Sequence, residues 1–310
     1  MLAGSRPLRF AGALLVLAGL LPVRAAAQAF TPPDGVGTVT LAWQYIDNTG
    51  HRLSDGYFSP TGQSATTSLA LDVEYAVSDR FSATVGIPYV FARYEGALPP
   101  PSRLPVDACQ CWQSSFADFS LGARYRFGGD TWAITPVARI GQPSHTYPYQ
   151  GEAVVGKQLG ELQLGVMSGL RLVEFLPKAT VQGGYTYAFV EKALDDVSVN
   201  RSTVFVDLGY AATRKLYVRG AWIWQHTHDG LRAGSPTGNP FRFPGELNTP
   251  ERFAERDRLL RVRYMQVVAG LSWNAGPVDI FASYTKYVWG RDAHNGQAFG
   301  LGASFYFGQP

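Results

Sequence analysis

Hydrophobic and polar residues alternate one by one through several stretches of this chain. In the stretch 68–77, one side of an extended chain carries leucine, valine and tyrosine, and the other carries small and acidic residues that include Asp72 and Glu74. The stretch 117–127 repeats the pattern, with Arg124 and Arg126 on its polar side. Successive side chains of a β-strand point to opposite faces, so both stretches are typical of strands. Because the apolar face carries aromatic residues at its ends, the pattern favours lipid outside and water inside over a soluble sandwich.

The same template, applied along the whole chain, predicts about twelve strands. They cover 37–46, 65–77, 80–92, 116–127, 131–141, 161–173, 178–190, 201–212, 215–227, 262–274, 277–289 and 297–307. Tight turns alternate with long connections at 47–64, 93–115, 142–160, 191–200, 228–261 and 290–296. Outer-membrane barrels have short periplasmic turns, long external loops and an even number of strands. We therefore predict an all-β fold, a transmembrane antiparallel up-and-down β-barrel, with about ten or fourteen strands as alternatives.

Aromatic residues mark both ends of the predicted strands. Those next to the long connections are Trp43, Tyr45, Phe91, Trp222, Trp224 and Trp289. Those next to the tight turns are Tyr75, Phe81, Tyr125, Trp132, Tyr210 and Trp273. Transmembrane barrels carry such girdles at the two membrane interfaces. The last strand ends on the aromatic Phe307, as barrel assembly signals do, so we expect outer-membrane lipid and the barrel assembly machinery as partners.

The first residues have the pattern of a secretory signal peptide. Arg6 and Arg9 precede an apolar run at 10–21, and Ala27-Gln28-Ala29 offers small residues at the positions of a cleavage site. The run is shorter than the roughly 20 residues of a membrane-spanning helix. We therefore predict a cleaved signal peptide at 1–29 and a barrel domain at 30–310, in the bacterial outer membrane.

Composition points to the same class of protein. Charged residues make up only 16% of the chain and aromatic residues 13%, and nothing after Leu21 is apolar enough for a membrane helix. A membrane protein without such helices has to close its backbone hydrogen bonds in a barrel. No basic cluster accompanies the net charge of +3, so nucleic acid is not an expected partner.

Three segments in the first half of the chain resemble a known family. They are Tyr75-Ala-Val-Ser-Asp-Arg-Phe-Ser-Ala-Thr-Val-Gly-Ile-Pro-Tyr89, Ala117-Asp-Phe-Ser-Leu-Gly-Ala-Arg-Tyr125, and Ile134-Thr-Pro136 leading to Gly141-Gln-Pro143. This region resembles the predicted outer-membrane proteins named after the meta-pathway of phenol degradation, which are often labelled as transporters. After the fifth strand the chain departs from the family's Pro-Thr-Gly, with Pro143-Ser144-His145 in its place. The resemblance implies a transport barrel and carries over no catalytic or ligand residue.

Charged residues on the polar sides of the strands are the candidate lining of a pore. They are Asp72, Glu74, Arg124, Arg126, Arg139, Arg171, Asp207, Arg219 and Asp279. A barrel of this size has little free interior once long side chains fill it. Two interpretations follow: a salt-bridged interior that braces and closes the wall, or a narrow pore whose charges orient small polar or anionic solutes.

The function we predict is passive passage of small solutes through this interior, without enzymatic activity or a cofactor. A closed structural or adhesive barrel is the alternative. A phospholipase at the outer rim comes third, because the segment His226-Thr-His-Asp-Gly230 lacks a nucleophile. Ser144 or Ser235 would have to reach a histidine through folding of the loops, and an orienting third group is required as well.

All histidines and cysteines fall in the long connections or at strand tips. The histidines are His51, His145, His226, His228 and His294. Cys109 and Cys111 form a disulfide, capture a metal together with histidines, or remain idle thiols. In an oxidising compartment we expect the disulfide, and we assign no metal ligand.

The longest connection contains one predicted helix. Thr249 is suited to the N-cap, Pro250 to the first helical position and Glu251 to the first turn. Phe253, Arg256 and Leu260 fall near one stripe of this helix. The segment therefore folds either as a lid over the mouth of the barrel or as a solvated surface helix, and we expect the solvated helix.

Overall fold

The computed structural model describes residues 29–308, apart from 61, 97–103, 175, 195–196 and 234–245. The predicted signal peptide, except Ala29, therefore lies outside the described residues. Within the described part of the chain, no helix is both long and apolar enough to cross a membrane.

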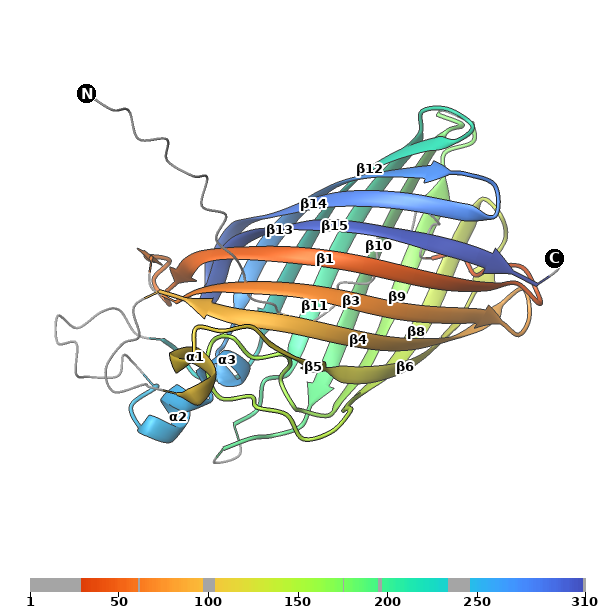
Figure 1. Cartoon of the computed structure of the whole chain (residues 1–310). Coiled ribbons are helices and arrows are strands. Elements are labelled where there is room, and N and C mark those ends of the chain that lie inside the picture. The colour runs from red at the N-terminus through yellow and green to blue at the C-terminus, as the bar shows by residue number, and fades with distance from the viewer. Residues whose placement is uncertain are drawn as a thin grey trace, which may run out of the picture.

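Twelve long antiparallel strands form a closed barrel (Figure 1). They are β1 (Gly37–Arg52), β3 (Gln63–Ala76), β4 (Phe81–Glu95), β6 (Asp118–Tyr125), β8 (Trp132–Pro143), β9 (Glu161–Arg171), β10 (Ala179–Val190), β11 (Arg201–Ala211), β12 (Leu216–Thr227), β13 (Arg263–Asn274), β14 (Val278–Arg291) and β15 (Ala293–Phe307). Three short segments extend the sheet, namely β2 (Phe58–Ser59), β5 (Gln113–Phe116) and β7 (Phe127–Gly128). Each long strand pairs with its neighbours in sequence, and β15 closes on β1 from Gly37↔Phe307 to Arg52↔Ala293. The prediction of a twelve-stranded up-and-down barrel is confirmed.

The barrel wall extends further at the long-loop end than the sequence predicts. We expected β1 to stop at residue 46 and the last strand to start at residue 297, whereas β1 and β15 stay paired through His51↔His294. The added part contains polar residues on both faces, such as Asn48 and Asn295, because it projects beyond the apolar belt. A template of alternating lipid-facing residues cannot detect strand of that kind.

Three short helices lie at the long-loop end of the barrel. They are α1 (Pro105–Ala108), α2 (Pro250–Ala254) and α3 (Arg256–Leu259), and they gather at the end opposite the tight turns and the C-terminus (Figure 1). Helix α2 begins as predicted. Thr249 is its N-cap, with its Oγ1 accepting a hydrogen bond from the Arg252 N–H at 3.2 Å, and Pro250 follows in the first turn.

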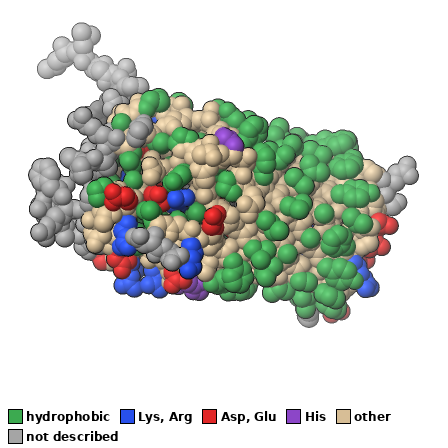
Figure 2. Space-filling view, turned by 90° about the horizontal axis from the view of Figure 1, so that it is seen from below, with side chains coloured by type: hydrophobic (Ala, Val, Ile, Leu, Met, Phe, Trp, Pro, Cys, Tyr) green, Lys and Arg blue, Asp and Glu red, His purple; other side chains and the backbone are tan. Residues whose placement is uncertain are grey.

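The outer face of the barrel is apolar. Leu71 and Leu121, on β3 and β6, are 37% and 58% exposed although their strands pair on both sides. Figure 2 shows hydrophobic side chains spread over the barrel wall and most charged side chains near its ends. An apolar belt of this kind is stable in lipid and not in water.

Arginine on this outer face is expected to impair insertion of the barrel into bilayers. Leu71→Arg and Leu121→Arg should each cost about 2–4 kcal/mol if the site lies near the midplane of the bilayer. Ala70→Ser, on the opposite face of β3, is the matched control and should fold like the wild type. The measurement is the folded fraction in lipid vesicles against urea concentration. Equal folding of all three variants would mean that the two faces are assigned in reverse.

Candidate functional site

The interior of the barrel encloses a cavity of about 400 Å³. Its wall includes six of the nine predicted pore-lining residues, Asp72, Glu74, Arg124, Arg139, Arg171 and Asp279. Small residues on the same strands make room for these side chains. A methyl group on Gly86 would lie 2.6 Å from the Ser120 Oγ, and one on Gly122 would lie 2.5 Å from the Thr84 Oγ1. The alternation of residues in the sequence therefore correctly places these charged side chains around a cavity inside the barrel.

Two ion pairs between predicted residues brace the inner wall, and a third joins Arg201 of β11 to Glu161 of β9. Arg124 pairs with Glu74 across β3, β4 and β6, and its Nε also donates to the Ser82 Oγ at 3.0 Å. Arg219 pairs with Asp207 across β11 and β12. Arg126, Asp207 and Arg219 do not line the cavity described here. The braced interior foreseen from the sequence is thus present, but it accounts for only part of the inward charge.

Two arginines have a different environment. The Arg139 Nη2 donates to the Ser120 Oγ at 2.8 Å, and the guanidinium carbon of Arg171 lies 4.6 Å from the centre of the Phe30 ring. Among the described residues, neither arginine forms an ion pair with a carboxylate. Asp279 accepts hydrogen bonds from the Tyr306 hydroxyl at 2.6 Å and from Asn274 at 2.8 Å. The cavity therefore presents two arginines that form no direct ion pair, together with the carboxylates of Asp72 and Asp279.

The chain before β1 lies inside the barrel at the tight-turn end. The Ala29 N–H donates to the Gln182 Oε1 at 2.9 Å, and the Thr135 hydroxyl donates to the Ala29 carbonyl at 2.5 Å. Ala29 and Phe30 are buried among wall residues that include Ala133 and Met167. The segment 30–33 forms part of the cavity wall, so it narrows the path through the barrel. The sequence of this segment carries no alternating pattern from which a role could be predicted.

Helix α3 covers the opposite end, where the notable contacts involve buried charge. The Arg256 Nε lies 2.6 Å from the Glu152 Oε1, and its Nη2 lies 3.3 Å from the Asp107 Oδ2. The backbone N–H groups of Glu152 and Ala153 donate to the Asp107 Oδ1 at 2.8 and 3.2 Å. Arg256 thus ties the α2–α3 segment to the β4–β5 and β8–β9 loops.

The expectation of a solvated surface helix is wrong for this segment. All four residues of α3 are buried, and Leu259 and Leu260 pack with Tyr264 and Tyr287. Arg258 adds an ion pair with Glu255, and its guanidinium carbon lies 3.8 Å from the Tyr149 ring centre. The charged sequence of this helix is typical of a solvent-exposed helix. Here the charged side chains are buried because they form ion pairs, with Glu255 next to the helix and with residues distant in sequence.

The pKa values of these loop carboxyls reflect their burial. Burial raises the pKa of Asp107, with Glu152 adding to the effect and Arg256 opposing it. Burial alone would also raise the pKa of Glu152. Arg256 and His51 outweigh it there and hold the pKa of Glu152 well below its usual range. At neutral pH the Glu152–Arg256 pair is therefore ionised.

The barrel resembles several solved outer-membrane proteins. An outer membrane channel from Pseudomonas putida F1 has a TM-score of 0.69 at 11% identity, over 91% of this chain and 99% of that one. The NanC porin has a TM-score of 0.51 at 11% identity, over 86% and 98% of the two chains. The translocator domain of the autotransporter NalP from Neisseria meningitidis has a TM-score of 0.50 at 12% identity, over 89% and 90%.

The protein is a bacterial outer-membrane β-barrel. No protein-family model matches its sequence, and neither does any curated protein. At identities of 11–12%, the likeness to these proteins establishes the fold alone.

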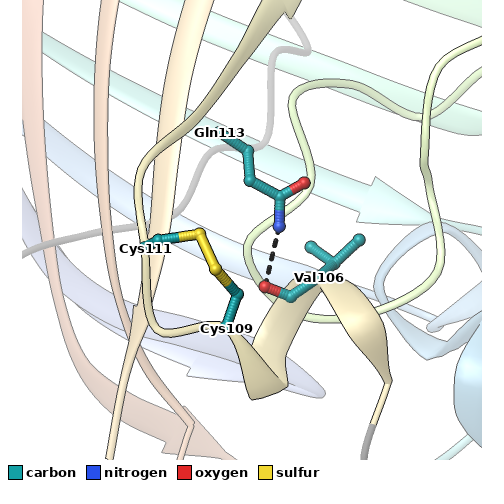
Figure 3. The surroundings of a disulfide bond; sticks show 4 residues. All are labelled: Val106, Cys109, Cys111 and Gln113. Carbon is teal, nitrogen blue, oxygen red and sulfur yellow. Dashed lines mark hydrogen bonds between the residues drawn. A yellow bond between two sulfur atoms is a disulfide. The ribbon is translucent and has the colours of Figure 1, made fainter.

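Cys109 and Cys111 of the outer-membrane barrel are joined by a disulfide next to α1 (Figure 3). Their Cα atoms are 5.1 Å apart, and both residues are exposed. Beside them, the Gln113 Nε2 donates to the Val106 carbonyl at 2.8 Å, which joins β5 to α1. With both sulfur atoms in the disulfide, no thiolate is left for the metal capture that the sequence held open.

The rim of the barrel holds a serine–histidine contact that the sequence did not reveal. The Ser202 Oγ lies 2.7 Å from the His228 Nε2, and the Tyr185 hydroxyl lies 2.8 Å from the same oxygen. Within the described chain, no carboxylate or amide contacts the other nitrogen of His228, so the orienting group of a triad is missing. Ser144 contacts its neighbour His145, and Ser235 lies outside the described residues. His226 stacks on Trp224.

Proposed function

We propose that this protein is a passive channel for small polar solutes, with a preference for anions. The observation behind the proposal is the cavity lined by Arg139 and Arg171. This cavity lies inside the barrel, and a solute crosses a barrel through its interior. A charge in a narrow and poorly hydrated passage acts on an ion more strongly than one on an open surface. The size of the cavity, about 400 Å³, suits small solutes.

Segments outside the wall lie over both ends of the barrel. The segment 30–36 lies at the tight-turn end, and the loops held by Arg256 lie at the other end. Each cover is fastened by a few polar contacts and small apolar clusters rather than by sheet pairing. We infer that movement of one or both covers widens the path, so that this structure corresponds to a narrow state of the channel.

We further propose that the protein belongs with the transporter-labelled family that its first half resembles. The three segments of that resemblance lie mainly in β4, β6 and β8, and they contribute Thr84, Gly86, Ser120 and Arg124 to the cavity wall. The resemblance thus covers wall that lines the path of a solute. It does not identify a phenol as the solute.

Liposome swelling tests the proposed function directly. Vesicles with the purified barrel should swell in small neutral and anionic solutes and resist larger ones, and planar bilayers should show single-channel currents. Barrels that are folded yet give neither swelling nor current would favour the closed structural or adhesive barrel. Release of fatty acid from phospholipid without current would instead support the rim phospholipase.

Neutralising the unpaired arginines is expected to change selectivity. The double variant Arg139→Gln, Arg171→Gln should shift the reversal potential in a salt gradient toward cations, because both positive charges face the cavity. The barrel should stay folded, since neither side chain is part of an ion pair in the described structure.

Arg124→Gln is the matched comparison for this double variant. It breaks the ion pair with Glu74 and leaves a buried carboxylate, so it should lower thermal stability as well as change current. An unchanged reversal potential in the double variant would contradict a path through this cavity.

A further inference from the structure

Three segments of the external end bring metal-ligating side chains together. His51 lies at the end of β1, Glu152 in the β8–β9 loop and His294 near the start of β15. Their candidate ligand atoms all lie within 4.8 Å of one another. The His51 Nε2 is 2.8 Å from the Glu152 Oε2, and the two imidazole rings have centres 4.2 Å apart. The two histidines are direct cross-strand neighbours in the β1–β15 pairing, which fixes their spacing.

His294 is oriented in the way that metal-binding histidines usually are. Its Nε2 lies 3.1 Å from the Asp257 Oδ1 on α3. Its Nδ1 is buried and has no hydrogen-bond partner among the described residues. A carboxylate that accepts from one ring nitrogen holds the lone pair of the other nitrogen ready for a metal. A buried nitrogen without a hydrogen-bond partner is energetically unfavourable, and a metal ion bound to this atom would remove that cost.

Glu152 is divided between two partners. Its Oε1 faces Arg256 at 2.6 Å, while its Oε2 faces His51. Gly62 leaves the space beside this contact, because a methyl group there would lie 2.6 Å from the His51 Nε2. The backbone of Gly62 has a φ of +75°, which favours glycine for a second reason. The side chains of Glu152 and His294 are 9% and 6% exposed and that of His51 16%, so His51 offers the entry path.

The charges that face the cluster favour a cation. The carboxylates of Asp107, Glu152 and Asp257 are opposed by the guanidinium of Arg256 and the ammonium of Lys157. If both histidines are neutral, these three carboxylates and two cations have a combined charge of −1. Ligand histidines bind metal in the neutral form, so a metal would displace the proton now held between His51 and Glu152.

We propose that His51, Glu152 and His294 form a binding site for a divalent transition metal of the zinc type. Two imidazoles and one carboxylate suit zinc or nickel, whereas calcium and magnesium require oxygen ligands. Bound ligand atoms would lie about 3–4 Å apart, so the widest present separation has to shrink by about 1 Å. The ion would connect the ends of β1 and β15 to the β8–β9 loop and, through Asp257, to α3.

Zinc binding by the purified, folded barrel tests this proposal. After removal of metal with a chelator, titration of the full-length protein with zinc chloride should show one tight site, with a dissociation constant of about 1 μM or below. His51→Ala and His294→Ala should each weaken binding at least about tenfold. Asp257→Asn should weaken it by about 10–100-fold, because it removes the group that orients a ligand. Bound Co²⁺ should show d–d absorption in the wild type and not in His51→Ala or His294→Ala.

His226→Ala and His228→Ala are the matched controls, since they remove external histidines that lie outside the cluster. Their zinc affinity should equal that of the wild type. The folding of each variant is checked by comparing the gel migration of unheated and boiled samples. In the wild type itself, zinc should slow proteolysis of the external loops and chelator should reverse the effect. Three results would each overturn the proposal. The wild type could lack a tight site, His51→Ala and His294→Ala could bind zinc as tightly as the wild type, or His226→Ala could lose binding.

Discussion

Removal of residues 30–33, at the predicted start of the mature chain, is expected to raise the single-channel conductance several-fold. These residues occupy the lumen at the tight-turn end, where Phe30 lies against Arg171 and Thr31–Pro33 form part of the cavity wall. The barrel should survive the deletion, because β1 begins at Gly37 and the backbone contacts of Gly35 and Val36 with Ala76 remain. Currents in planar bilayers and swelling rates with solutes of graded size are the measurements. The size cut-off should rise together with the conductance.

Phe30→Ala is the graded control for this deletion. It removes the aromatic contact with Arg171 and the packing on Ala133 and Met167, but it leaves the hydrogen bond from the Thr31 hydroxyl to the Asp79 carbonyl. We expect more frequent opening of the channel without a larger maximal current. If the deletion leaves conductance and size cut-off unchanged, the segment does not limit flow, and the external cover does.

The barrel wall could be predicted from the sequence because its signal is local. Each strand carries its own alternation, and each tight turn separates two strands, so errors do not spread along the chain. The prediction failed where the wall leaves the membrane. At His51 and His294 the strands continue with polar residues on both faces, and only their pairing with one another shows that they are strands.

The candidate site could be predicted only in part. The inward direction of Arg139 and Arg171 follows from strand parity, but that Arg124 pairs with Glu74 depends on the register of three strands. The position of the segment before β1 had no periodic signal, although Pro32 and Pro33 favour an extended chain. His51 in β1 and Glu152 in the β8–β9 loop are about a hundred residues apart in sequence, so no local pattern could predict their contact.

Arg256→Ala is expected to open the external cover of the barrel. The substitution leaves Asp107 and Glu152 buried without their counter-charge, and breaking a buried pair in this way costs about 3–5 kcal/mol. The strands of the wall pair independently of Arg256, so the loss should appear as local opening of the loops and α3. Faster proteolysis of the external loops and larger, noisier currents are the expected results.

Arg232→Ala, which removes an exposed loop arginine, is the matched control and should behave like the wild type. Arg256→Lys keeps the charge but cannot hold two carboxylates in the forked geometry of a guanidinium, so an intermediate effect is expected. Equal proteolysis of the loops in Arg256→Ala and the wild type would show that apolar packing around Leu259 alone holds the cover closed.

Acid should reproduce part of the Arg256→Ala effect in the wild type. The pKa of Glu152 in the folded protein lies well below its ordinary value of 4.5, because Arg256 and His51 outweigh the effect of burial. Its ion pair therefore adds stability that is fully present above about pH 4.5 and is lost as the pH falls below that value. Loop proteolysis by an acid-active protease should thus rise in the wild type below this pH and change much less in Arg256→Ala, where the pair is already broken.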